Sequence, residues 1–91
     1  MNKSQLGAPV ADAASMSRAG ADAAVGVVFA AIADALARDE TVAIAGFGKF
    51  AVRRRRARTG RNPHTGEPVA IAASRAPSFK PAKALRDAVN G

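Results

Sequence analysis

The sequence contains no cysteine, tryptophan or tyrosine and only one histidine, His64. Without cysteine the chain forms neither disulfide bonds nor thiolate metal sites, so we expect an intracellular rather than a secreted protein. A single histidine also rules out a cluster of histidine ligands. No uninterrupted run of 18 apolar residues is present, so we expect no membrane-spanning segment, and no segment of signal-peptide type is visible at the N-terminus.

Large apolar side chains are also scarce. The chain has 91 residues and is 48% hydrophobic, but 24 of its residues are Ala, against four Phe, three Leu and three Ile. A chain of this length buries only a modest fraction of its surface. We therefore expect one small domain whose folded unit is larger than one chain, such as an obligate dimer.

Acidic side chains are rare in the second half of the sequence. Residues 1–48 carry three basic and five acidic residues, a net charge of −2, whereas residues 49–91 carry eleven basic and two acidic residues, a net charge of +9. Ten of the fourteen basic residues are Arg, which suits planar recognition of phosphates and base edges. This separation indicates a scaffold joined to a surface that binds a polyanion.

The residue groupings that catalysis requires are missing as well. The basic half holds no paired carboxylates and no set of nucleophile and base, and the other carboxylates are scattered over Asp12, Asp22, Asp34, Asp39 and Glu40. The glycines at 46 and 48 are too close together for a nucleotide-binding loop, and no helix is predicted directly after them. We expect a protein that is not an enzyme and that uses no metal or cofactor.

Two helices are predicted in the N-terminal half. Residues 17–38 place apolar side chains at helical spacing, and Ser17 is a favourable N-cap. Residues 3–15 predict a weaker helix, which Asn2 or Ser4 would cap.

The basic half predicts a hairpin and a closing helix. Residues 41–44 and 50–56 are expected to be strands, joined by the glycine-containing turn 45–49. Residues 81–89 predict a short helix with proline at its first position.

Between these elements lies a long segment without core residues. Residues 57–68 contain almost no large apolar side chains, and residues 69–79 alternate as a returning strand. A structureless loop of this length is uncommon in a compact domain unless it is functional, and residues 62–66 have the composition of a turn. We therefore expect a two-stranded arm that projects from the body and is ordered at its tip by a partner.

Motifs spread along the basic half are similar to those of a known protein family. They are Gly46-Phe47-Gly48-Lys49-Phe50, Arg58-Thr59-Gly60-Arg61-Asn62-Pro63, Thr65-Gly66, Pro77-Ser78-Phe79-Lys80-Pro81 and Lys83-Ala84-Leu85. Together they resemble the bacterial HU/IHF family of histone-like DNA-binding proteins, and the ends of the chain, residues 1–6 and 87–90, are similar to the HU branch.

This resemblance implies an α+β fold in an intertwined homodimer or heterodimer. Two N-terminal helices would form a dimerisation body over residues 1–40, and a three-stranded antiparallel sheet would span 41–80 with a long β-ribbon arm at 53–75. A short C-terminal helix would occupy 81–91.

The resemblance also implies a function. The protein would be an architectural protein of the bacterial nucleoid in the cytoplasm, binding double-stranded DNA with low sequence specificity. It would bend and compact DNA through arms in the minor groove, and would prefer bent, nicked or gapped duplexes. An IHF-like, site-specific heterodimer subunit and an RNA-binding basic module are the alternatives.

Particular residues are implied as DNA contacts. Arginines are attracted to the negative potential of a narrow minor groove, and Pro63 would wedge between base pairs rather than serve only as a turn residue. Phe47, Phe50 and Phe79 are expected in the core rather than as platforms for base stacking. The expected DNA-binding residues are Lys3, Arg53, Arg55, Arg58, Arg61, Asn62, Pro63, Arg75, Lys80, Lys83 and Arg86.

Arg54 and Arg56 depart from the family pattern, because an acidic or small residue is expected at both positions. They complete an unbroken run of four arginines and should strengthen non-specific binding to phosphates. Strand alternation places Arg54 and Arg56 on the opposite face from their neighbours, so the two pairs cannot face the same DNA.

Other departures concern local structure. Gly7 and Pro9 disfavour a regular first helix, and Pro9 either kinks this helix or marks its true start. The pair at 67 and 68, Glu and Pro, makes the far side of the arm tip less basic. Ala82 stands where glycine is usual, so the turn into the last helix should differ from that of the family.

Overall fold

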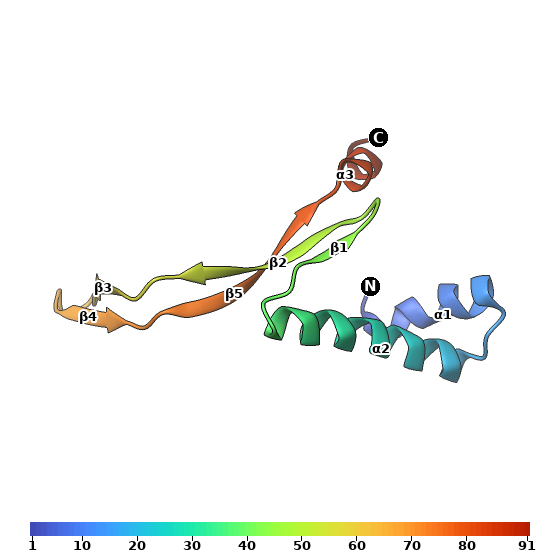
Figure 1. Cartoon of the computed structure of the whole chain (residues 1–91), viewed down its shortest axis with the longest axis horizontal. Coiled ribbons are helices and arrows are strands. Elements are labelled where there is room, and N and C mark those ends of the chain that lie inside the picture. Colours follow the sequence, from blue (N-terminus) through green and yellow to red (C-terminus); the bar gives the residue numbers. More distant parts are fainter.

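The computed structural model describes residues 1–91 and contains three helices and five strands (Figure 1). In chain order they are α1 (Lys3–Ala14), α2 (Arg18–Ala37), β1 (Val42–Ile44), β2 (Gly48–Arg55), β3 (Arg58–Arg61), β4 (Pro68–Ile71), β5 (Ser74–Pro81) and α3 (Lys83–Asn90). The helices α1 and α2 lie side by side, the sheet lies beside them, and a long arm extends away from both (Figure 1). The expected α+β, HU-like arrangement of elements is confirmed.

Both N-terminal helices begin at side-chain caps. The side chain of Asn2 accepts a hydrogen bond from the Gln5 backbone N–H at 3.3 Å, and the Gln5 side chain accepts one from the Asn2 N–H at 2.7 Å. Ser17 caps α2 by accepting from the Gly20 N–H at 3.0 Å. Because α1 starts at Lys3 and continues through Pro9, the prediction that Pro9 could mark the helix start is wrong.

Gly7 lies where α1 packs closely against Asp22 of α2, and it does not break α1. It is buried, and a Cβ atom at this position would lie 1.8 Å from Oδ1 of Asp22. The Asp22 carboxylate is held there by Arg18 at 2.9 Å, and Arg18 also donates to the Ser4 carbonyl of α1. The missing side chain of Gly7 thus makes room for an ion pair that ties the two helices together.

The sheet has the order β1-β2-β5, and all its pairs are antiparallel. Phe79 packs between Phe50 and Phe47, with ring centroids 4.8 Å and 5.5 Å away. A Cβ atom on Gly48 would lie 2.5 Å from the Phe79 ring, so glycine is needed for this aromatic cluster to form against the sheet.

The end of the sheet differs from the expectation for the last helix. Pro81 is the final residue of β5, opposite Gly48, so the prediction that it begins the closing helix is wrong. Ala82 caps α3 in an extended conformation, with φ −73° and ψ 160°, and its N–H donates to the Phe47 carbonyl at 2.8 Å. This conformation needs no glycine, so alanine is accommodated without strain.

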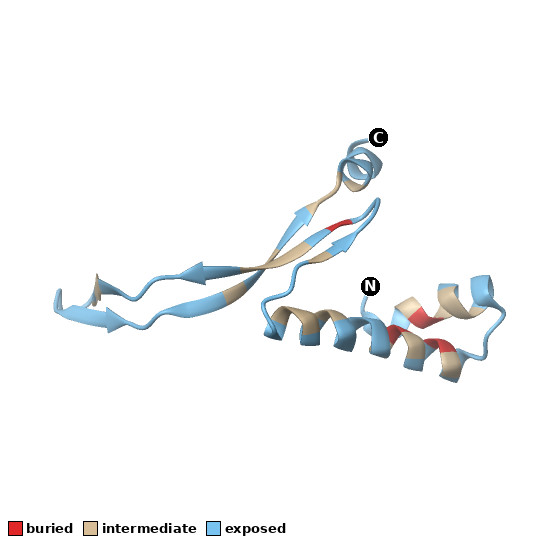
Figure 2. Ribbon diagram, viewed as in Figure 1, coloured by how far each residue is buried: buried red, intermediate tan, exposed pale blue.

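The chain has almost no core of its own. Only four of its 91 residues are buried, and Figure 2 shows exposed surface along most of the ribbon. Val28 and Phe29 on α2 are 55% and 46% exposed, and Phe47 and Phe79 of the sheet are also open. The radius of gyration is 18.9 Å, whereas a compact domain of this length has about 12 Å. Within this chain these apolar surfaces remain uncovered.

The length and apolar composition of α2 would also suffice to cross a membrane. The expectation from uninterrupted apolar runs missed this, because Asp22 and Asp34 divide a helix that is otherwise almost entirely Ala, Val and other apolar residues. The core helix of a soluble protein can have the same length and composition, so this property alone is weak evidence for a membrane span.

Candidate nucleic-acid interface

The arm is one antiparallel ribbon with a short interruption. Its inner part pairs β2 with β5 as far as Arg55 and Ser74, and its outer part resumes with Arg58 opposite Ile71. Two residues lie between these pairs on each side, so the register continues without a bulge. The predicted arm is confirmed, although each of its predicted long strands is divided in two.

The arm ends in a tightly bonded turn that presents Pro63 to solvent. Asn62 N–H donates to the Glu67 carbonyl at 2.9 Å, and Gly66 N–H donates to the Asn62 carbonyl at 2.7 Å. Gly66 has a φ of 74°, which favours glycine. The Asn62 side chain accepts from the His64 N–H at 2.8 Å, so it closes an Asx-type turn around Pro63. Asn62, an expected DNA contact, therefore also shapes the tip.

The outer ribbon is thin because Gly60 carries no side chain. A Cβ atom at Gly60 would lie 2.7 Å from Cδ1 of Ile71, which shows that the Ile71 side chain lies across this position. Nearby, Nη1 of Arg61 donates to the Gly66 carbonyl at 3.0 Å and braces the tip. A thin ribbon with apolar contact on its own surface has the dimensions of an element that enters a nucleic-acid groove.

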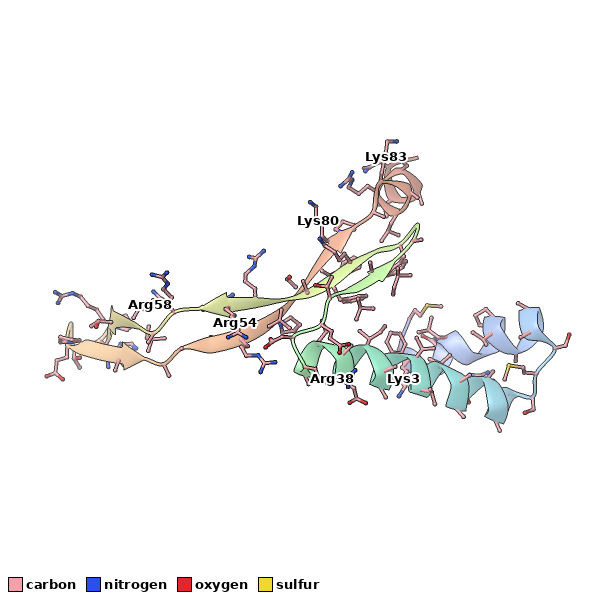
Figure 3. The ribbon with its side chains drawn as sticks, viewed as in Figure 1. Lys3, Arg38, Arg54, Arg58, Lys80 and Lys83 are labelled. Carbon is pink, nitrogen blue, oxygen red and sulfur yellow. The ribbon has the colours of Figure 1, made fainter.

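Three of the expected basic contacts lie on the same side of the molecule. Arg58, Lys80 and Lys83 point to the side away from α1 and α2 in Figure 3. Within the chain, the one carboxylate paired to any of these three is Asp87, which lies 2.6 Å from Lys83. All the expected basic contacts on the arm, the sheet and α3 have exposed side chains: Arg53, Arg55, Arg58, Arg61, Arg75, Lys80, Lys83 and Arg86.

Lys3 lies apart from this group, on the helical side of the molecule (Figure 3). Its Nζ would be 3.7 Å from a Cβ atom built on Gly26 of α2, so the lysine lies across that helix. Arg38, at the end of α2, pairs with Glu40 at 3.2 Å. The hydrogen bond and the charge of Glu40 raise the pKa of Arg38.

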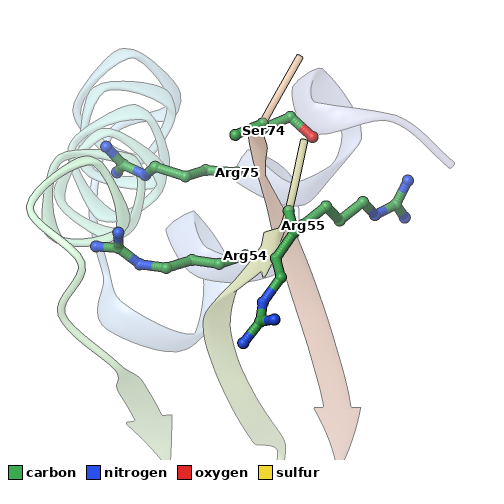
Figure 4. A pocket seen from close by; sticks show the side chains of 6 residues that line it. Arg54, Arg55, Ser74 and Arg75 are labelled. Atoms are coloured by element: carbon green, nitrogen blue, oxygen red, sulfur yellow. The ribbon is translucent and has the colours of Figure 1, made fainter. Parts of the chain in front are cut away.

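Arg75, another expected DNA contact, is turned toward α2. Its Nη2 donates to the Ala37 carbonyl at 2.9 Å, and its Nε lies 3.3 Å from Oδ1 of Asp39. Arg54 lies beside it and reaches the other oxygen of Asp39 at 2.7 Å (Figure 4). This role of Asp39 was not predicted from the sequence. Two arginines at opposed strand positions repel each other, and a nearby carboxylate is one way to compensate their charge.

A ribbon of exposed arginines on a small helix-and-sheet body defines a class of protein, namely one that binds nucleic acid through backbone and groove contacts. A family model described as bacterial DNA-binding protein matches residues 1–90. DNA-binding protein HU-beta of Escherichia coli (strain K12) is 50% identical over 90 residues, which are 99% of this chain and 100% of that protein. DNA-binding protein HU 1 of Bacillus subtilis (strain 168) is 52% identical over 91 residues, 100% of this chain and 99% of that protein.

A solved structure agrees with these sequence matches. The Anabaena HU–DNA cocrystal structure superposes with a TM-score of 0.87 at 40% identity, covering 98% of this chain and 97% of that one. The chain belongs to the HU family of bacterial DNA-binding proteins. It is an architectural DNA-binding protein and, like the other members of this family, not an enzyme.

Proposed function

We propose that this protein works as a homodimer that binds double-stranded DNA with little regard to sequence and bends it with two arms in the minor groove. The observation that carries the proposal is the arm itself, an exposed ribbon whose arginines have no partner on the body except at its root. Arginines on a narrow ribbon suit the negative potential of the minor groove and require no particular base sequence. Such a protein acts in the bacterial cytoplasm, on the nucleoid.

The dimer is supported by the open apolar surfaces. Phe29 of α2 and Phe79 of the sheet are 46% and 41% exposed although both are core-type residues. Residues 1–91 of one chain leave both side chains uncovered. A second copy presents the same two surfaces and can cover both, which makes folding and dimerisation one process. A heterodimer with a related chain would use the same surfaces.

The DNA contacts follow from the side of the molecule on which the charges lie. The body side chains Lys80, Lys83 and Arg86 continue the arm surface and would hold the flanking phosphates. Pro63 is exposed at the tip, where it can wedge between base steps. The arm contacts in this proposal are Arg53, Arg55, Arg58, Arg61, Asn62 and Pro63. Lys3 would meet only DNA that wraps toward the helices, and DNA contact by Arg75 requires that it leave α2.

The proposal is tested by titrating DNA at several salt concentrations. If roughly 6–10 phosphates are contacted, the affinity should fall about 10³–10⁵-fold between 50 and 200 mM salt. Duplexes of equal length but unrelated sequence should bind alike, and nicked or gapped duplexes should bind more tightly because part of the unstacking cost is already met. A flat salt response, or strong preference for one undistorted sequence, would overturn the proposal.

Two competitor arms of the same titration distinguish the alternatives. Duplex RNA should compete poorly, since its wide, shallow minor groove does not match a thin arm. Preferential binding of duplex RNA would favour the RNA-binding alternative. Tight binding to one defined site only in the presence of a second, different chain would instead favour an IHF-like heterodimer subunit.

A further inference from the structure

The root of the arm is held to the end of α2 by a single carboxylate. Asp39 lies just beyond α2, and its two oxygens contact Nη2 of Arg54 at 2.7 Å and Nε of Arg75 at 3.3 Å. Figure 4 shows both arginines extending toward the helix from neighbouring strands. We propose that Asp39 is a positioning residue that fixes the direction of the arm by holding these two arginines; the proposal rests on DNA binding through the arm.

The strand register shows why a carboxylate is needed here. Arg54 and Arg75 are directly opposite each other in the β2–β5 pair. Like charges at opposed positions destabilise a ribbon, and no acidic residue on either strand separates them. Asp39 supplies the missing negative charge from outside the sheet. The ribbon is thereby neutralised at this one pair and attached to the body by the same contact.

The end of α2 adds a second attachment. Nη2 of Arg75 donates to the carbonyls of Leu36 and Ala37 at 3.3 Å and 2.9 Å. The last carbonyls of a helix lack partners within the helix, and a cation placed there is favoured by the helix dipole. Arg75 therefore joins the strand to both the helix end and Asp39.

The backbone of Asp39 gives independent support. Its φ is 60°, in the left-handed region. Glycine adopts this conformation without strain, whereas other residues are uncommon there, with Asp and Asn the most tolerated. A side chain that remains at a position suited to glycine indicates that the side chain itself is needed.

The contacts of Asp39 lie at the root of the arm, where they can influence its direction. One pair beyond Arg54 and Arg75, at Arg55 and Ser74, the β2–β5 pairing ends. The Asp39 carboxylate therefore contacts the ribbon close to the end of the sheet, where the arm leaves the body and its direction is set. Arg54, which from sequence should add a phosphate contact, is assigned here to positioning, while Arg53 and Arg55 on the other face remain available for DNA.

Five single substitutions separate this positioning role from a simple change of charge. Asp39→Asn and Arg54→Gln both break the contact but change the net charge in opposite directions; asparagine also tolerates the left-handed backbone. Glu40→Gln and Arg56→Gln make the same two charge changes outside the contact. Arg54→Lys retains the charge and tests for rescue. Dimer content and melting temperature are recorded for each variant.

Two measurements are made on this set. Without DNA, hydrogen exchange of the amides at 53–55 and 74–76 should quicken in Asp39→Asn and Arg54→Gln and stay near the parent value in the other three variants. With DNA, energy transfer across an end-labelled duplex should report loss of bending in Asp39→Asn but not in Glu40→Gln. Arg56→Gln is compared only without DNA, because Arg56 is expected to bind phosphates. A pure charge effect would instead move Asp39→Asn together with Glu40→Gln, and opposite to Arg54→Gln.

The outcomes are distinct. If the exchange rate and the bending of Asp39→Asn match those of Glu40→Gln, Asp39 has no positioning role. The same holds if exchange quickens and bending falls only in proportion to a lower melting temperature. Failure of the parent protein itself to bend DNA would overturn the proposed bending function, whereas the exchange comparison without DNA would still decide whether Asp39 holds the arm.

Discussion

The helical body and the arm differ in composition and in the kind of side chain that they leave exposed. The body is rich in alanine and valine, has a net charge of only −2 over residues 1–48, and leaves apolar side chains such as Val28 exposed. The arm carries exposed arginines and is held by backbone hydrogen bonds, with Ile71 over Gly60 as an apolar contact. The body therefore leaves apolar surface uncovered, and the arm leaves positive charge uncompensated.

This difference shows how a short chain can divide stability from binding. In the proposed dimer, apolar burial between the two copies would supply the folding free energy, so the arm would need no core and could remain thin. The ion pairs at the arm root are exposed, with the Arg54 side chain 72% accessible, so each contributes only about 0–1 kcal/mol. They set the direction of the arm more than they stabilise the fold.

The largest effect is expected from a charge on the open face of α2. Phe29→Lys should abolish folding at micromolar concentration, because an unpaired charge buried against a second copy costs about 3–5 kcal/mol per chain. Ala30→Lys is the matched control, since Ala30 lies one turn before Asp34 on the same helix face and should be tolerated. Circular dichroism and sedimentation measure both. A well-folded Phe29→Lys monomer would show that the body needs no partner.

Removal of the outer arm should weaken DNA binding but leave the stability of the body almost unchanged. In a chain that lacks residues 58–71, with Ala57→Asn and Ala72→Gly forming a two-residue turn, the retained register permits a short hairpin. Thermal stability should change by no more than about 0.5 kcal/mol because no body contact is lost.

DNA titration of the same shortened chain should show a strong loss. The salt dependence should weaken by about 0.9 in log–log slope for each phosphate contact removed. Unchanged DNA affinity would show that the DNA-binding surface lies on the body rather than on the arm.

Within the arm, Pro63→Ala should separate bending from affinity. Every arginine is retained, so binding to intact duplex should survive with similar salt dependence, while bending and the preference for nicked DNA should fall. Arg58→Ala with Arg61→Ala should weaken binding to every duplex instead. Energy transfer across a short duplex, run beside a binding titration, measures both. Bending as sharp as the parent's would reduce Pro63 to a turn residue.

The smallest effect is expected at the cap of α1. Asn2→Ala should lower stability by about 1 kcal/mol, because the Gln5 N–H loses its side-chain acceptor. Ser4→Ala is the control; its hydroxyl only donates to the Asn2 side chain and caps no backbone group. Thermal melts at one protein concentration measure the difference. DNA affinity of Asn2→Ala should equal that of the parent.

Local sequence signals predicted most of the elements because each signal acts over a few residues. The cap at Ser17, the glycine turn before β2 and the turn at the arm tip were all visible as short patterns. Pro81 was misplaced because proline suits a strand end as well as a helix start, and only pairing with Gly48 decides between them.

Features that depend on distant contacts were out of reach. Gly7 was read as a flaw in α1, since nothing in the local sequence shows Asp22 lying against it. Likewise Arg54 and Arg75 were assigned to phosphates, because their partner Asp39 is separated from them by a strand and a hairpin. The sequence predicted where charge accumulates but not which charges the fold itself uses.

Hydrogen exchange with and without DNA tests the division between body and arm most directly. In the free protein, amides at 58–71 should exchange far faster than those of α2, whose protection should approach the global stability of the dimer. Addition of a short duplex should slow exchange chiefly in the arm and leave α2 nearly unchanged. Protection that appears on α2 while the arm stays unprotected would contradict the account.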